Sequence, residues 1–187
     1  MFMRLARSVL IVAAAAFLAS PVVAQMYEHP PRDNSEVRVS PNGLVAQTIG
    51  TAQFSISYSR PFVKGRKVFG ELQPFGDVWR SGANEATTIV IPVDITVEGQ
   101  PLAAGVYALM TIPGEKEWSV IFNSQAKQWG AFKYDPAKDA LVVKVDSKQA
   151  PHQEMLTYSF EDVTENSATI VLHWGTTAVP FHIQIAG

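Results

Sequence analysis

The residues best suited to bind a ligand lie in one stretch of the chain, between positions 58 and 87. Arginine presents a planar fork of N–H donors that fits a carboxylate or a phosphate, and asparagine adds an adaptable donor and acceptor. Glycines in the same stretch allow backbone N–H groups to approach a ligand closely. The stretch therefore predicts a pocket for an anion or a sugar, built from Arg60, Arg80 and Asn84 with Trp79 as an apolar wall. The full set of candidate ligand-binding residues is Arg60, Lys64, Arg66, Trp79, Arg80, Asn84, Glu85 and Trp129.

The same residues also allow a purely structural interpretation. Arg80 and Glu85 can form an ion pair that pins a long loop, while Asn84 caps a turn. The connection from Tyr58 to Thr87 is nearly thirty residues long and contains four glycines. A loop of this length in a compact domain is usually functional or contains some structure of its own.

The sequence contains no pattern of residues that indicates catalysis. It has no cysteine, so thiol nucleophiles and zinc–thiolate sites are absent. No Gly-x-Ser-x-Gly turn occurs, and Lys64-Gly65-Arg66-Lys67 has the wrong order for a phosphate-binding loop. Asp77 and Glu85 are the one pair of carboxylates that suggests glycoside hydrolysis, and two acids in a loop are a weak signal. No catalytic residue and no cofactor are predicted.

Histidines give no metal site either. His173 and His182 are the only two expected on adjacent strands. If Ile170 lies opposite Phe181 in a hairpin, the two histidines are separated along the strands by about 13 Å, at ~3.3 Å per residue. One metal ion cannot bind both in that register.

Aromatic residues suggest a second way to bind a sugar, by stacking. Trp118 and Trp174 lie in strand-like patterns and are expected in the core, whereas Trp129 follows a predicted strand and is a candidate to line a site. Phe132 and Tyr134 continue the same loop.

Short segments with period-two alternation must position these residues. Phe54, Ile56 and Tyr58 alternate with serines, which is typical of a half-buried strand. Turn signals such as Glu98-Gly99-Gln100-Pro101 separate the segments. No stretch of ten residues after position 24 shows a helical period. We therefore predict an all-β fold, an antiparallel, jelly-roll-like β-sandwich of about nine strands. The expected strands cover residues 54–58, 87–91, 93–97, 106–112, 118–122, 141–145, 155–160, 168–174 and 181–185.

The N-terminus resembles an export signal. Arg4 and Arg7 precede an apolar run of about ten residues, and Val22-Val23-Ala24 offers the small residues that a signal peptidase reads. We expect a signal peptide over residues 1–24, cleaved near Ala24, then an extended lead-in over 25–35 and a single sandwich domain over 36–187. The alternative is a membrane anchor that is retained, although the run is short for a spanning helix.

Charge is unevenly distributed along the chain. Without residues 1–24 the chain has 13 Lys and Arg against 17 Asp and Glu, which argues against nucleic acid as a partner. Residues 37–70 carry five basic and no acidic residues, and residues 71–187 carry seven basic and 14 acidic ones. The basic block coincides with much of the candidate site.

Several motifs in this order resemble those of the domain-of-unknown-function family 2911. They are Tyr58-Ser59-Arg60-Pro61, Lys64 to Gly70, Trp79 to Thr88, Ala104 to Tyr107, Ile112-Pro113-Gly114, Trp118 with Ile121-Phe122-Asn123, and Gln128-Trp129-Gly130. The resemblance runs from about Val45 to the C-terminus. It implies a bacterial, exported, β-rich protein and brings no activity, cofactor or catalytic residue.

These observations favour a periplasmic or secreted, non-catalytic module that binds a small anionic or carbohydrate ligand. One alternative is a metal-free hydrolase acting on envelope glycans or esters, with Glu85 or Asp77 as acid or base. Another is a structural envelope protein that pairs through a strand edge. No membrane span is expected after cleavage, and the sequence leaves the oligomeric state open.

Overall fold

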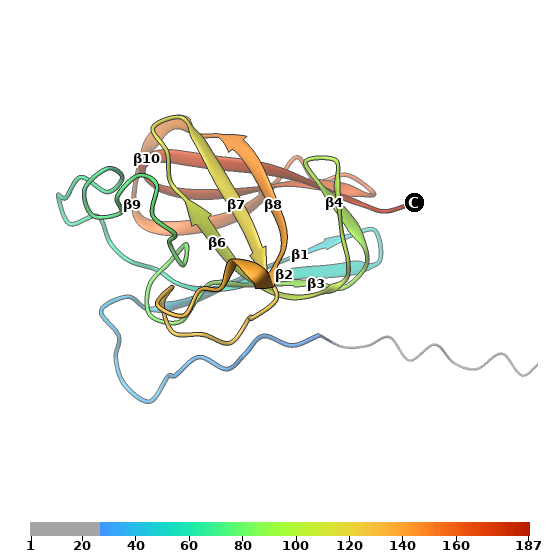
Figure 1. Ribbon diagram of the computed structural model, residues 1–187, viewed down its shortest axis with the longest axis horizontal. Helices are drawn as coiled ribbons and strands as arrows, with labels where there is room; N and C mark the ends of the chain where they lie inside the picture. Colours follow the sequence, from blue (N-terminus) through green and yellow to red (C-terminus); the bar gives the residue numbers. More distant parts are fainter. Residues whose placement is uncertain (1–26) are drawn as a thin grey trace, which may run out of the picture.

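A computed structural model describes residues 27–187, which form two antiparallel sheets (Figure 1). The larger sheet has six strands in the order β1-β2-β3-β6-β7-β8. Their bounds are β1 Asn42–Ile49, β2 Ala52–Ser59, β3 Thr88–Ile91, β6 Gly105–Ile112, β7 Glu117–Asn123 and β8 Asp139–Asp146. The smaller sheet has four strands in the order β5-β4-β10-β9. Their bounds are β4 Ile95–Val97, β5 Gln100–Leu102, β9 Lys148–Glu161 and β10 Ser167–Ile185.

The main apolar core fills the space between the sheets. Phe54 and Ile56 of β2 and Phe122 of β7 belong to it, together with Leu172 and Phe181 of β10. All five are buried because the inward positions of each strand alternate with outward ones. The predicted antiparallel β-sandwich is confirmed, with ten strands where about nine were expected.

Three details of the strand prediction were wrong, each for a local reason. β1 and β5 were missed, because β1 has no strict alternation and β5 is only three residues long. The two strands expected at 168–174 and 181–185 are one strand, β10, in which Gly175 adopts a positive φ of 62° at a register shift. The hairpin that was to place Ile170 opposite Phe181 therefore does not exist, and Ile170 pairs with Phe160 of β9. His173 and His182 lie on that same strand.

The long connection between β2 and β3 has structure of its own. Val63, Val68 and Phe69 are buried in the core, and isolated bridges join the connection to the sheets at Phe62 and Trp79. The connection is therefore a packed part of the domain, and its backbone can hold side chains in fixed positions.

The N-terminal segment, residues 29–40, runs across the outer face of the larger sheet, and we refer to it as the strap (Figure 1). The serines of β2 that alternate with the core residues face the strap. The ring nitrogens of His29 lie 2.8 Å from Ser55 Oγ and from Thr88 Oγ1. Arg32 donates to Ser57 Oγ and to the Ser57 and Ala86 carbonyls. The outward-facing serines of β2 thus bind the strap.

A carboxylate from the β2–β3 connection fixes the strap further. Glu85 accepts two hydrogen bonds from Arg38, at 2.6 and 2.8 Å, and lies 3.4 Å from Arg32 Nη1. The side chain of Arg32 is only 6% exposed, so its charge depends on Glu85 and on the carbonyls around it. Burial lowers the pKa of Arg32 to about 10, which leaves it protonated at neutral pH.

Two sequence predictions concern the chain's relation to membranes. In the part of the chain that the structure describes, no helix is long and apolar enough to cross a bilayer. The signal peptide predicted for residues 1–24 lies outside the described residues.

The substitution Glu85→Gln is expected to destabilise the fold by roughly 2–4 kcal/mol at pH 7, because it leaves a buried arginine without its counter-charge. The hydrogen bond from Arg38 is the main reason that the pKa of Glu85 is lowered to about 2. A carboxyl with a folded-state pKa below its usual ~4.3 stabilises the fold fully above about pH 5 and loses that contribution as the pH falls toward 2.

Urea unfolding at pH 7, 4 and 2.5 measures this effect. The difference between the parent and Glu85→Gln should shrink as the pH falls. Glu117→Gln, which breaks an exposed ion pair with Lys144, is the control and should change stability little. Equal effects of the two variants at pH 7 would contradict the role given to Glu85.

Candidate functional site

Five of the eight predicted site residues line two pockets on either side of the segment 80–86. Lys64, Arg66 and Arg80 line the first, which we name the Arg80 pocket; Val39, Ser40 and Trp174 are among its other walls. Glu85 and Trp129 line the second, which we name the Trp129 pocket; Pro30, Pro31, Gln128 and Phe132 are among its other walls. One loop in the sequence thus serves two sites in space.

Three cationic side chains converge on the Arg80 pocket. Its volume is about 240 Å³, which is small for a ligand pocket and suits a compact group such as a phosphate or a carboxylate. No acidic residue lies among the described residues that line it. The pocket therefore has a surplus of positive charge close to its walls.

Arg80 is the most unusual of these residues because it lacks a partner. Its Nε is shut off from solvent and has no hydrogen-bond acceptor within residues 27–187. No carboxylate of the described chain forms an ion pair with it. Burial lowers the pKa of Arg80 below its ordinary value. A half-buried guanidinium without an acceptor raises the free energy of the folded protein.

The other two cations are held in place by different contacts. Arg66 donates from Nε to the Val63 carbonyl at 2.9 Å and from Nη2 to the Phe62 carbonyl at 2.6 Å. The ammonium of Lys64 lies 5.9 Å from the centre of the Phe62 ring. Neither side chain forms an ion pair within the described residues. Both charges therefore remain available to a ligand.

Local backbone strain accompanies this arrangement. Lys64, Ser81 and Asn84 all have positive φ, at 50°, 53° and 59°. Gly82 fits where a Cβ atom would come within 2.8 Å of Thr87 Oγ1. Residues other than glycine rarely adopt such φ values. Clusters of residues with these values are typical of functional sites.

Three predicted residues line neither the Arg80 pocket nor the Trp129 pocket. Arg60 donates to the Leu156 carbonyl and to Thr157 Oγ1, at 2.9 and 3.1 Å, and thereby joins β2 to β9. Trp79 is buried in the core, where its ring stacks on Trp174 at a centroid distance of 5.8 Å.

Asn84 is the third of these residues. It donates to the Ser40 carbonyl, and its own carbonyl accepts from Gly130 N–H. It thereby connects the segment 80–86 to the strap on one side and to the Trp129 loop on the other.

Glu85 pairs with the strap and not with Arg80. The ion pair between Arg80 and Glu85 that the structural interpretation expected does not form, because Arg38 and Arg32 occupy both carboxylate oxygens. This leaves Arg80 free of a protein partner in the described chain.

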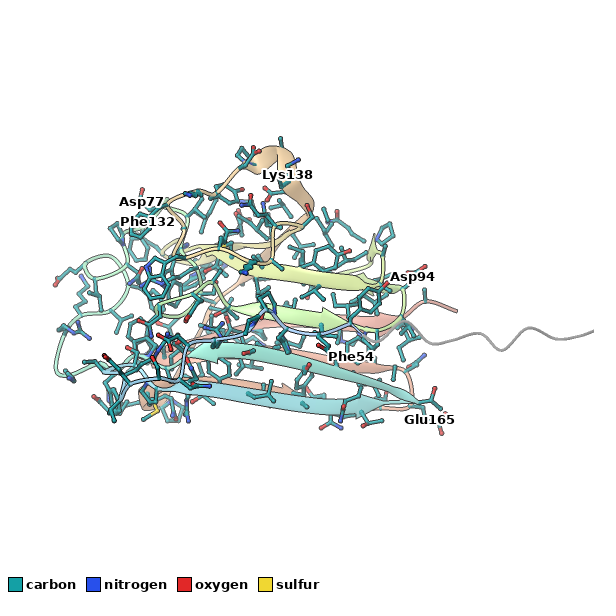
Figure 2. All side chains as sticks on the ribbon, turned by 90° about the horizontal axis from the view of Figure 1, so that it is seen from below. Phe54, Asp77, Asp94, Phe132, Lys138 and Glu165 are labelled. Carbon is teal, nitrogen blue, oxygen red and sulfur yellow. The ribbon has the colours of Figure 1, made fainter. Side chains whose placement is uncertain are left out.

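The carboxylates considered for hydrolysis do not form a catalytic pair. Glu85 has a pKa near 2 and is ionised, so it cannot donate a proton as a general acid at neutral pH. Asp77 is exposed and lines neither the Arg80 pocket nor the Trp129 pocket (Figure 2). Among residues 27–187, no three His, Asp or Glu side chains gather closely enough to hold a metal ion.

Several residues at the two pockets were not predicted. Arg32 and Arg38 lie about fifty residues before Glu85, and no local pattern indicates that pairing. Trp174 was expected in the core, where it lies, but it also forms a wall of the Arg80 pocket. Its indole N–H has no acceptor in the described residues.

The substitution Arg80→Met should leave the stability of the ligand-free protein unchanged or raise it by up to about 1 kcal/mol. It removes a partly buried charge and breaks no hydrogen bond. The matched control is Arg60→Met, which loses two hydrogen bonds and is expected to destabilise the fold by about 1–3 kcal/mol. Urea unfolding of both variants distinguishes the roles. If Arg80→Met lowers the free energy of unfolding as much as Arg60→Met does, Arg80 has a structural role.

Comparisons with known proteins give one match. A model for the family described as "Protein of unknown function (DUF2911)" matches residues 40–183. No curated protein and no solved structure matches the chain. The matched range covers most of the chain and includes the connection that separates the two pockets, so the resemblance seen in the sequence motifs is confirmed: the chain belongs to the DUF2911 family.

Proposed function

We propose that this protein is an exported, non-catalytic binding module whose Arg80 pocket holds a small anionic ligand through a carboxylate or phosphate group. The observation that carries the proposal is the half-buried guanidinium of Arg80, which has no partner in the described chain. An oxyanion would supply the missing acceptor and the missing counter-charge together.

The neighbours of Arg80 support an anion over a neutral ligand. Lys64 and Arg66 add two further positive charges at the same pocket, and no acid lines it within the described residues. Trp174 contributes a second N–H group without an acceptor. Every unpartnered polar atom at this pocket is therefore a donor, as an anionic ligand requires.

Export is supported by the N-terminal sequence alone. Arg4, Arg7, the apolar run and Val22-Val23-Ala24 form the expected order of a signal peptide. The absence of cysteine throughout the chain is compatible with an oxidising compartment.

Isothermal titration of the purified protein with phosphate, sulfate, acetate and a neutral hexose tests the anion site. We expect saturable binding of at least one oxyanion and none of the hexose. Arg80→Gln should weaken that binding about 10- to 100-fold, since it removes a charge-assisted hydrogen-bonding partner.

The control for this titration is Lys144→Gln, which removes one positive charge at a residue that lines neither pocket and pairs only with Glu117. It should leave binding unchanged. If Arg80→Gln and Lys144→Gln have the same effect, or if the parent binds no oxyanion, the proposal is wrong.

One observation favours a second candidate function, self-assembly through a sheet edge. β1 is an outer strand of the larger sheet, pairs with β2, and has no charged residue from Asn42 to Ile49. Its Leu44 side chain is 67% exposed. An uncharged edge strand is a template for pairing with another chain.

If β1 serves this purpose, the protein should form dimers or larger assemblies at micromolar concentration, and Leu44→Lys should return it to a monomer. Sedimentation velocity measures both. A parent protein that stays monomeric over the concentration range would exclude pairing through β1.

A further inference from the structure

The Trp129 pocket carries an inference that is independent of the Arg80 pocket. It has a volume of about 510 Å³, within the range of pockets that hold small organic ligands. Three separate parts of the chain form it: the strap, the segment 85–88, and the loop after β7. Figure 2 labels Phe132 on that loop, away from the strands.

Two aromatic side chains at this pocket are exposed to an unusual degree. Trp129 is 58% exposed and Phe132 is 84% exposed, whereas the other three tryptophans are buried. Exposing two neighbouring aromatic rings is unfavourable in water and marks surfaces that bind something. Such rings offer a large rigid contact area at a small cost in conformational entropy.

The backbone that carries Trp129 is fixed although its ring is free. Ala86 N–H donates to the Gln128 carbonyl, Gly130 N–H donates to the Asn84 carbonyl, and Trp129 bridges with Glu85. Gly130 has a positive φ of 66°, and a Cβ atom there would clash with the Phe132 ring at 2.8 Å. The backbone that carries the rings is therefore in place before any ligand arrives, which favours binding.

A polar group of the pocket lacks a partner, and it is an acceptor. Gln128 Nε2 donates to the Gln125 carbonyl at 2.8 Å, and this bond fixes the orientation of the amide, because a flipped Oε1 would face that carbonyl. Gln128 Oε1 is shut off from solvent and has no donor within residues 27–187. A hydroxyl group on a ligand would satisfy it.

The charge at the pocket is positive. Lys127 and Lys133 are exposed at its wall. Glu85 is the only acid that lines it among the described residues, and Arg32 and Arg38 already neutralise that carboxylate. A ligand with a carboxylate is favoured over a neutral one.

We infer that the Trp129 pocket binds an acidic saccharide, such as a chain of uronic acid units. The apolar face of a sugar ring, with its partly positive C–H groups, complements the negative face of the indole. The hydroxyl groups around the ring supply the donor that Gln128 Oε1 lacks. The carboxylate lies toward Lys127 and Lys133.

Tryptophan fluorescence of the purified protein tests this inference directly, because Trp129 is the only exposed tryptophan of the described chain. The probes are a trimer of galacturonic acid and, for comparison, a trimer of galactose. We expect the acidic trimer to change the emission in a saturable way, to protect Trp129 from quenching by acrylamide, and to bind at least tenfold more tightly than the neutral one.

Three variants separate the contributions. Trp129→Leu, assayed by titration calorimetry, should lose at least tenfold in affinity with an unchanged melting temperature, because the ring is exposed. The double variant Lys127→Gln, Lys133→Gln should bind both trimers alike. Arg80→Gln should bind the acidic trimer as the parent does, so failure of the anion site and failure of this site are distinguishable.

Other outcomes would overturn the inference. Equal affinity of the parent for both trimers would show that the pocket does not select an acidic ligand. Unaltered affinity of Trp129→Leu would show that the sugar does not stack on the indole ring. Binding of a proline-rich peptide with no response to either trimer would show that the pocket serves a protein partner instead.

Discussion

The carboxylate of Glu85, held between Arg32 and Arg38, is the interaction on which both pockets depend. It attaches the strap to the connection between β2 and β3. The strap then provides Pro30 and Pro31 to the Trp129 pocket, and Val39 and Ser40 to the Arg80 pocket. Neither pocket has a complete wall without the strap. A segment that precedes the family-matched region at residues 40–183 therefore shapes the sites within it.

Two titratable groups, His29 and Glu85, make the attachment of the strap sensitive to acid. Burial is the main reason that the pKa of His29 is lowered to about 4, and the charge of Arg32 adds to it. A histidine whose folded-state pKa lies below its usual ~6.5 favours the folded state fully above that value and loses this contribution as the pH falls toward 4. Glu85 loses its contribution below about pH 5. At neutral pH both groups keep the protonation states that hold the strap, so the pockets stay assembled there.

The parts of this protein that local chemistry determines were predictable from its sequence. The alternation of Phe54, Ile56 and Tyr58 with serines identified β2, and the turn that includes Gly99 was found because glycine readily adopts positive φ. The partner of Glu85 was not predictable in this way. Arg38 is 47 positions away from Glu85, whereas Arg80, only five positions away, was the partner that the structural interpretation expected. Local proximity favoured the wrong arginine because the packing of the strap, which decides the pairing, is a long-range property.

The cationic residues that line the Arg80 pocket could be named from the sequence, but the contacts of the other candidates could not. Lys64, Arg66 and Arg80 converge as expected, whereas Arg60 joins two strands and Trp79 enters the core. Both of these residues have chemistry that serves structure as well as binding, and only their contacts show which role they play. Buried polar atoms that lack a hydrogen-bond partner distinguish these two roles more clearly.

Buried polar atoms without partners are rare in folded proteins, and each one calls for a reason. The described chain has four such side-chain atoms, and three of them belong to residues that line the two pockets. Arg80 Nε and Trp174 Nε1 are donors at the Arg80 pocket, whereas Gln128 Oε1 is an acceptor at the Trp129 pocket. An oxygen acceptor would complete the hydrogen bonds of the first pair, and a hydroxyl donor would complete that of Gln128. The two pockets therefore differ in the kind of group that would complete their hydrogen bonds, and a single ligand group cannot satisfy both.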